Sequence, residues 1–174
     1  DIAEVTLDHP EVKKVEAEVQ EKIQKLLAIN GTRTSDDFHR ELGQIMWLHC
    51  GLERTEKGLM EGIEKVKALR EEFWTDLKLV GESDELNMSL EKAGRVADFL
   101  EFAEVMMYDA AHRKESCGGH FRGEYQTPEG EALRDDENFT YVGAWEHTGV
   151  GGEPTLHKED LSFSSVKLAT RSYK

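Results

Sequence analysis

Apolar residues recur every three or four positions through the first two thirds of the chain, which is the spacing of one face of an α-helix. The clearest stripe consists of Val12, Val15, Val19, Ile23 and Leu26. Asp8 and Pro10 suit the start of this helix and Asn30-Gly31 its end, because proline tolerates a first helical turn and glycine adopts a left-handed cap without steric cost. We expect an amphipathic helix whose apolar stripe faces inward.

The same spacing predicts three further helices, joined by short turns. One begins at Thr34 or Ser35, ends near Gly51 and buries Phe38, Leu42, Ile45 and Met46. The next carries Leu59, Ile63, Val66, Phe73 and Leu77. The last is capped by Ser83 and Asp84, reaches Arg113, spans about 45 Å and turns inward Leu86, Leu90, Ala93, Ala97, Leu100 and Met107. Short turns favour antiparallel neighbours, so the predicted fold is mainly α: an antiparallel bundle of about four helices, the last one long, followed by a largely irregular C-terminal tail.

The helical spacing stops near Ser116, and eight of the 15 glycines lie beyond that point. Short strands are predicted at 139–142 and 161–168, where aromatic and β-branched residues gather. A Gly-rich tail buries too little apolar surface to offset roughly 1 to 2 kcal/mol per residue of backbone entropy. We therefore expect two parts: a helical bundle over 1–115, and an irregular tail over 116–174 that packs on the bundle and on another surface.

Composition narrows the class of protein. The 174 residues include 22 Lys and Arg against 36 Asp and Glu, so the net charge of −14 argues against nucleic-acid binding through a basic surface. No apolar run is long enough for a membrane span, and no basic segment followed by an apolar stretch opens the chain, so we expect neither a membrane span nor a signal peptide. Cys50 and Cys117 are expected to be free thiols in a reducing compartment. The chain opens on Asp1, which suggests a piece of a longer protein.

The densest group of candidate functional residues follows the predicted long helix, where opposite charges alternate from Arg113 to Glu137. In a catalytic interpretation, His120 is a general base and the arginines bind an anionic substrate. In the structural interpretation, which we favour, the arginines pair with Glu115 and Asp135, Gly118-Gly119 turns the chain, and the backbone satisfies His120. The chain carries no Walker loop, G-x-G-x-x-G, G-x-S-x-G or H-E-x-x-H motif.

A structural zinc site is the weaker alternative. Its four ligands would be His49, Cys50, Cys117 and His120. His49 and Cys50 are sequence neighbours, and their side chains diverge by about 100° on a helix. We therefore expect no metal site.

Several ordered motifs connect this region with a known family. They are Arg113-Lys114-Glu115-Ser116-Cys117-Gly118-Gly119-His120-Phe121-Arg122, then Tyr125, then Arg134-Asp135-Asp136-Glu137-Asn138-Phe139, and finally Thr170-Arg171-Ser172-Tyr173. This order resembles the C-terminal region of the flavoprotein subunit of succinate dehydrogenase and fumarate reductase. The chain departs from the family at Cys117, where arginine is usual, and at Gly119, where alanine is usual. The resemblance marks as motif and structural anchor residues Arg113, Glu115, Ser116, Gly118, His120, Arg122, Tyr125, Arg134, Asp135, Asp136, Arg171, Ser172 and Tyr173.

The resemblance implies a parent subunit that binds FAD covalently through a histidine and exchanges a hydride between the flavin and succinate or fumarate. No residue here matches the family's flavin-binding or substrate-binding motifs, so we expect no catalytic, cofactor-binding or metal-binding residue in this chain and no activity of the chain alone. The implied partners are the flavin-binding domain of the same chain, an iron-sulfur subunit and a membrane anchor. The implied location is cytoplasmic, peripheral on the inner face of the cell membrane in a respiratory complex.

Three other interpretations remain open. L-aspartate oxidases share the Glu-Ser-x-Gly-x-His core, so their C-terminal domain is the nearest alternative. A free-standing acidic helical module that binds a basic protein is the alternative from another class. An enzyme in its own right comes third.

Overall fold

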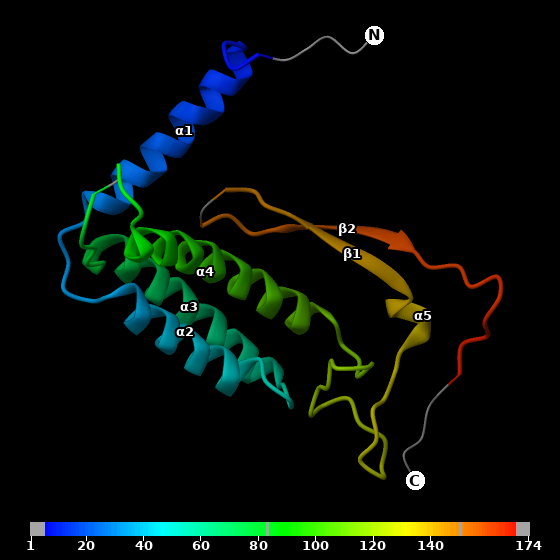
Figure 1. The fold of residues 1–174 in the computed structure, drawn as a ribbon. Coiled ribbons are helices and arrows are strands. Elements are labelled where there is room, and N and C mark those ends of the chain that lie inside the picture. Colours follow the sequence, from blue (N-terminus) through cyan, green and yellow to red (C-terminus); the bar gives the residue numbers. More distant parts are fainter. Residues whose placement is uncertain (1–5, 83, 150, 170–174) are drawn as a thin grey trace. The chain divides into compact units, whose positions relative to one another are not determined.

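A computed structural model describes residues 6–82, 84–149 and 151–169 (Figure 1). The elements are α1 (Pro10–Leu27), α2 (Ser35–His49), α3 (Glu56–Asp76), α4 (Met88–His112), α5 (Asp136–Phe139), β1 (Tyr141–Glu146) and β2 (Thr155–Asp160). The mainly α class and the long fourth helix are confirmed. No helix within the described residues combines the length and the apolar character that crossing a bilayer requires.

The chain forms two compact units. One contains the residues up to Leu42 together with Lys67–Leu100, and the other contains Gly43–Val66 together with the residues from Glu101 onward. Each of α2, α3 and α4 therefore contributes a stretch to both units. The expected division between a bundle over 1–115 and a tail over 116–174 stays a prediction.

The first unit has an aromatic centre. Phe38 of α2 and Phe73 of α3 are fully buried, and their rings meet edge to face with centroids 5.3 Å apart. The connection between α1 and α2 is held to the end of α3, because the Thr32 amide donates to the Asp76 carboxylate at 2.8 Å. This bond satisfies a loop amide where the helical ladder has ended.

The second unit packs the start of α3 against the last turns of α4. A Cβ at Gly62 would lie 2.7 Å from His49 Cβ and 2.8 Å from Met107 Sδ, so only glycine fits this contact. The antiparallel hairpin β1–β2 runs in register from Tyr141↔Asp160 to Glu146↔Thr155. It is fixed to α4 by Trp145, whose indole Nε1 donates to Asp109 Oδ1 at 2.8 Å.

Both strand predictions need correction. The structure places β2 at Thr155–Asp160, and residues 161–168 form no strand, so the prediction there was wrong. The six residues of β1 are already paired with 155–160, which leaves the apolar residues beyond Asp160 without a partner strand. The other predicted strand, 139–142, overlaps β1 only in part, because Phe139 belongs to the unpredicted helix α5.

Two helix predictions also change. Helix α4 begins at Met88, since the Asn87 side chain caps it by accepting from the Leu90 amide at 3.0 Å. Its 25 residues span about 38 Å, and Leu86, expected inward, is 92% exposed. In α1 the helix exists, but Leu26 is the only fully buried member of the stripe, while Val15 and Val19 are 55% and 52% exposed. The inward stripe was thus wrong for most of α1.

Candidate functional site

Arg122 lies at the centre of the loop that follows α4, residues 113–135, which we call the post-helix loop. Its side chain is fully buried, and its Nη1 donates to the carbonyl oxygens of Ala110 at 2.9 Å and Ala111 at 3.2 Å. These carbonyls lie in the last turn of α4, where the helix has no amide of its own to satisfy them. The Arg122 amide donates to Ser116 Oγ at 2.8 Å. The guanidinium therefore caps α4 with a positive charge at the negative end of the helix dipole.

The second nitrogen of this guanidinium is less well satisfied. Nη2 of Arg122 is buried and has no hydrogen-bond partner within the described part of the chain. The Tyr125 ring lies 5.4 Å from the guanidinium carbon, close enough for a cation–π contact. Tyr125 thus supplies part of the stabilisation that a missing acceptor would give.

Glu124 connects this cap to the start of α3. Its Oε1 accepts from the Glu56 amide at 2.7 Å, and its Oε2 accepts from Arg122 Nε at 3.2 Å. Desolvation alone would raise the pKa of Glu124, but hydrogen bonds from the Glu56 amide, its own amide and Arg122 outweigh it and hold the pKa below its usual value. A carboxylate at the positive end of α3 and a guanidinium at the negative end of α4 are thereby joined in one ion pair.

Arg113 and Glu115 fix the loop to the segment before β1. Arg113 Nε donates to Glu115 Oε1 at 2.9 Å, and Arg113 Nη2 donates to the Phe139 carbonyl at 2.8 Å. The Glu115 side chain is only 2% exposed, and its Oε2 also accepts from the Asp135 amide at 2.9 Å. Glu115 therefore holds both ends of the post-helix loop.

Among the described residues no arginine pairs with Asp135, contrary to the expectation. Its carboxylate accepts from the Asn138 amide at 3.2 Å and so caps α5. Arg134 pairs instead with Asp136, through Nε at 2.9 Å, and its Nη1 donates to the Ala169 carbonyl at 3.0 Å. The charged residues between Arg113 and Glu137 are thus linked to one another and to the backbone, but the order of residues in the sequence does not reveal which groups pair.

His120 is held from both sides. Its Nδ1 lies 3.0 Å from Arg54 Nη1, and its Nε2 lies 2.9 Å from the Arg113 carbonyl oxygen. An arginine can only donate, so Nδ1 accepts and Nε2 carries the proton. Burial, together with the nearby Arg54, lowers the pKa of His120 although the bond to the Arg113 carbonyl opposes this. The imidazole is neutral and presents no free nitrogen to a substrate, which disfavours the general-base interpretation.

The remaining predicted residues have simpler places. Gly118 has φ +59° in a tight turn that Cys117 and His120 close with two backbone hydrogen bonds of 2.8 and 3.0 Å, so a residue free to adopt the left-handed region is needed there. Cys117, where the family usually has arginine, is partly exposed at the start of this turn. Arg171, Ser172 and Tyr173 lie outside the described residues.

Sequence reasoning missed Arg54, in the turn between α2 and α3. Its amide donates to the Phe121 carbonyl at 3.0 Å, and its carbonyl accepts from the Gly123 amide at 2.8 Å, in addition to the contact with His120. Arg54 and His120 are 66 positions apart, and no periodicity joins them. The sequence signal that could have drawn attention to this residue was an arginine in a short polar turn.

The polar side chains of the post-helix loop bind other groups of this chain. The described residues contain no group of three His, Cys, Asp or Glu side chains placed to hold a metal ion, and both nitrogens of His120 are engaged. The polar atoms of the post-helix loop serve the ends of α3 and α4, and the loop offers no glycine-rich cradle at a helix start for a dinucleotide phosphate. We assign no cofactor contact to this chain.

Comparison with known proteins defines the class. The profile of the family described as fumarate reductase flavoprotein C-term matches residues 39–173. The chain belongs to this family.

Individual relatives agree. A fumarate reductase flavoprotein subunit from a Serratia species is 29% identical over 160 residues, and a succinate dehydrogenase flavoprotein subunit from Rickettsia bellii is 30% identical over 164 residues, covering 90% and 92% of this chain. A solved structure of Escherichia coli quinol fumarate reductase superposes with a TM-score of 0.78 and 25% identity, over 95% of this chain and 27% of that one. The chain spans about a quarter of the length of the curated relatives it matches, 25% in both cases.

Proposed function

We propose that this chain is the C-terminal helical domain of a flavoprotein subunit that interconverts succinate and fumarate. The parent subunit would hold FAD and pass electrons to an iron-sulfur subunit. Similar proteins are named as fumarate reductase and succinate dehydrogenase flavoprotein subunits, and the match covers nearly the whole chain. Both directions of the reaction use the same chemistry, so the proposal includes both.

Within that subunit the chain would be structural. One observation carries this role: the most distinctive polar residues of the family motif point inward and bind this chain's own backbone. Glu115, Ser116 and Arg122 are 2%, 0% and 0% exposed. Glu115 holds the two ends of the post-helix loop, while Arg122, whose amide donates to Ser116, caps α4 and reaches the start of α3 through Glu124. Buried polar groups that bind their own backbone in this way stabilise a loop, which supports a structural role.

We place the chain against the flavin-binding domain of its own subunit, within a complex that includes an iron-sulfur subunit and a membrane anchor. A similar solved structure is named as quinol-fumarate reductase with menaquinol, with a TM-score of 0.75 and 26% identity, which supports assignment to a quinone-linked complex. In such a complex the chain would lie at the cytoplasmic face of the cell membrane, without entering it.

A chimera tests the proposal. The C-terminal quarter of the Escherichia coli fumarate reductase flavoprotein subunit is replaced by this chain, and bound flavin and fumarate reduction are measured in the assembled complex. We expect the chimera to retain flavin and activity well above a subunit truncated at the same point. A chimera no better than the truncated subunit would contradict the proposal.

A further inference from the structure

The connection between α1 and α2, residues 28–34, carries the only Asn-Gly pair of the sequence, Asn30-Gly31. The other two asparagines, Asn87 and Asn138, precede a methionine and a phenylalanine. In an Asn-Gly pair the amide nitrogen of the glycine can attack the side-chain carbon Cγ of the asparagine, because no Cβ shields that nitrogen. Asn30 is exposed to water. The pair is therefore a candidate for spontaneous deamidation.

Packing against α3 requires this glycine. A Cβ at Gly31 would overlap the backbone carbonyl group of Asp76, the last residue of α3. Gly31 has no positive φ, so it is not the left-handed helix cap that the sequence suggested. A larger residue would push the connection away from the end of α3. The reactive pair is therefore built into the fold.

Three consecutive backbone amides hold the connection closed. The Gly31 amide donates to the Leu77 carbonyl at 3.0 Å. The amides of Thr32 and Arg33 donate to the Asp76 carbonyl at 3.0 and 3.1 Å. The Asp76 carboxylate also accepts from the Thr32 amide at 2.8 Å and from the Thr32 hydroxyl at 3.0 Å. All these groups belong to the first compact unit.

The first of these bonds protects Asn30. To attack Cγ, the Gly31 nitrogen must lose its proton, and in the closed connection that proton lies in the hydrogen bond to the Leu77 carbonyl. Leu77 is fully buried, so packing fixes the position of this acceptor. The closed connection is therefore unreactive, and Asn30 reacts only after the connection opens.

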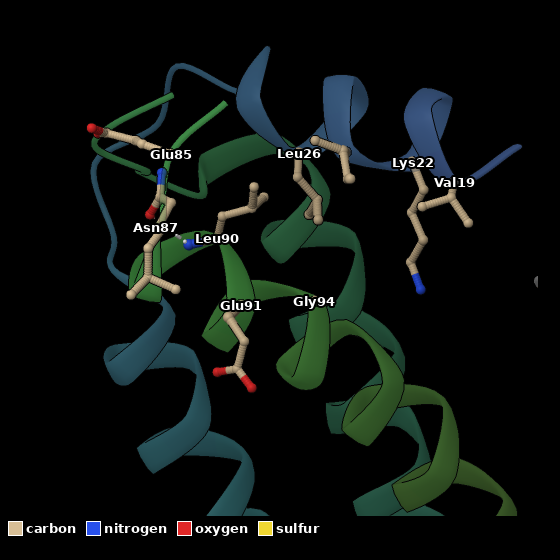
Figure 2. A pocket seen from close by; sticks show the side chains of 10 residues that line it. Val19, Lys22, Leu26, Glu85, Asn87, Leu90, Glu91 and Gly94 are labelled. Atoms are coloured by element: carbon tan, nitrogen blue, oxygen red, sulfur yellow. Dashed lines mark hydrogen bonds between the residues drawn. The ribbon is translucent and has the colours of Figure 1, made fainter. Parts of the chain in front are cut away.

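Helix α1 makes such opening accessible. Leu26 is 2% exposed, but Val15 and Val19 are 55% and 52% exposed. Figure 2 shows an open groove of about 370 Å³ beside Leu26, between α1 and Leu90 of α4. A segment with few buried apolar contacts opens at a lower free energy than the core. Fluctuations that lift α1 release the connection that follows it.

We propose that Asn30 is a deamidation site that the connection protects while it is closed. In the open connection the Gly31 nitrogen loses its proton to water, bonds to Cγ of Asn30 and displaces the side-chain nitrogen as ammonia, which leaves a succinimide ring. The proton lost from Gly31 returns through water to the departing ammonia. A water molecule then opens the ring at either of its carbonyls, to aspartate or to isoaspartate, so water is consumed, ammonia is released and nothing is oxidised. The proposal does not depend on the proposed function, because it concerns the chemistry of this chain alone.

The modification keeps the connection open. Isoaspartate at position 30 routes the main chain through the former side chain, which inserts a methylene group between the Cα of residue 30 and the nitrogen of Gly31. The Gly31 amide is then displaced from the Leu77 carbonyl, and the bonds from Thr32 to Asp76 shift with it. A chain modified in this way should hold α1 less firmly.

Mass spectrometry of the tryptic peptide 26–33 measures the conversion of Asn30 over time at mildly alkaline pH. We expect Asn30 to react in concentrated urea, and to react at least about tenfold more slowly in the folded chain, since the connection must first open. Asn87 and Asn138 in the same samples serve as references, because bulky neighbours shield the amides that follow them. Equal rates of Asn30 conversion in urea and in the folded chain would overturn the proposal, as would no conversion in urea.

Variants test whether the connection controls the rate. Asp76→Ala removes the carboxylate that binds Thr32 and leaves Asn30 and Gly31 unchanged. Losing hydrogen bonds to a charged group should raise the rate in the folded chain about tenfold, and Thr32→Val, which removes only the hydroxyl, should raise it less. Glu91→Ala, which removes an exposed carboxylate paired with Arg95 on α4, is the matched control and should keep the original rate.

Circular dichroism checks that the variants keep their helices, and in urea all of them should react at the rate of the unmodified sequence. If Asp76→Ala loses its helices, Thr32→Val decides the outcome. Folded variants that react no faster than the unmodified sequence would contradict the proposal. Hydrogen exchange of the isoaspartate form should show lost protection at Gly31 and Thr32, and full protection there would contradict the predicted opening.

Discussion

Arg113→Ala removes the guanidinium that pairs with the buried Glu115 carboxylate. The Arg113 side chain is 28% exposed and that of Glu115 is 2% exposed, so the pair lies at the edge of the interior. After the substitution, Glu115 keeps the amide of Asp135 as a donor but loses its counter-charge, and the Phe139 carbonyl loses the guanidinium Nη2. The bonds lost are those that join the end of α4 to the segment before β1.

The expected cost follows from the burial. Removing one partner of a fully buried ion pair costs roughly 3 to 5 kcal/mol, and of an exposed pair less than about 1 kcal/mol. Water reaches part of Arg113, and the hydrogen bond from the Asp135 amide to Glu115 remains. We therefore expect Arg113→Ala to lower the free energy of unfolding by about 2 to 3 kcal/mol. Arg134→Ala is the matched control, since its partner Asp136 is 44% exposed, and we expect less than about 1 kcal/mol there.

Urea denaturation measures the loss of global stability, and hydrogen exchange shows which amides lose protection. In Arg113→Ala the amides of the post-helix loop and of β1 should lose protection before those of α3 and α4, because the loop is the less stable part. Equal costs for Arg113→Ala and Arg134→Ala, with unchanged protection in the loop, would refute the reasoning and make Arg113 a solvated surface charge.

Three further outcomes follow from the same contacts. Burial lowers the pKa of His120 from 6.5, so only the unfolded chain takes up its proton just below that pH. The free energy of unfolding should therefore fall as the pH drops below about 6.5, and His120→Gln should flatten this slope in urea titrations. Glu124→Gln weakens the link between Arg122 and the α3 amide and should lower the free energy of unfolding by about 1 to 2 kcal/mol in urea titrations, while Glu137→Gln, at an exposed position in α5, serves as the control. Calorimetry of the isolated chain with FAD, succinate or fumarate should show no micromolar binding; a measurable heat of binding would contradict the structural role.

The helices could be predicted because their stripes are local. Phe38 and Phe73, assigned to separate helices from spacing alone, both lie in the core. The stripe of α1 has the same spacing, yet Val15 and Val19 remain half exposed. Periodicity identifies a helix and its apolar face, but it does not tell whether other residues of this chain bury that face.

The pairings in the post-helix loop could be predicted only in outline. The motif from Arg113 to Arg122 indicated both the family and a charged anchor, but the partners of Arg122 are carbonyls of α4 and a glutamate that caps α3. Backbone acceptors leave no mark in the sequence, so such bonds cannot be read from residue types. Asp135 was expected to pair with an arginine, whereas its carboxylate accepts from the Asn138 amide of α5, a helix that the sequence did not predict.

Turnover per bound flavin tests the central claim most directly. It is measured in the chimeric fumarate reductase that carries this chain, with His120→Gln and Arg122→Met compared with the unmodified chimera. Because both side chains are engaged within the chain, we expect less assembled subunit and less flavin, with unchanged fumarate reduction per flavin. Full flavin content with a large loss of turnover per flavin would contradict the account, since it would place one of these residues in the catalytic machinery.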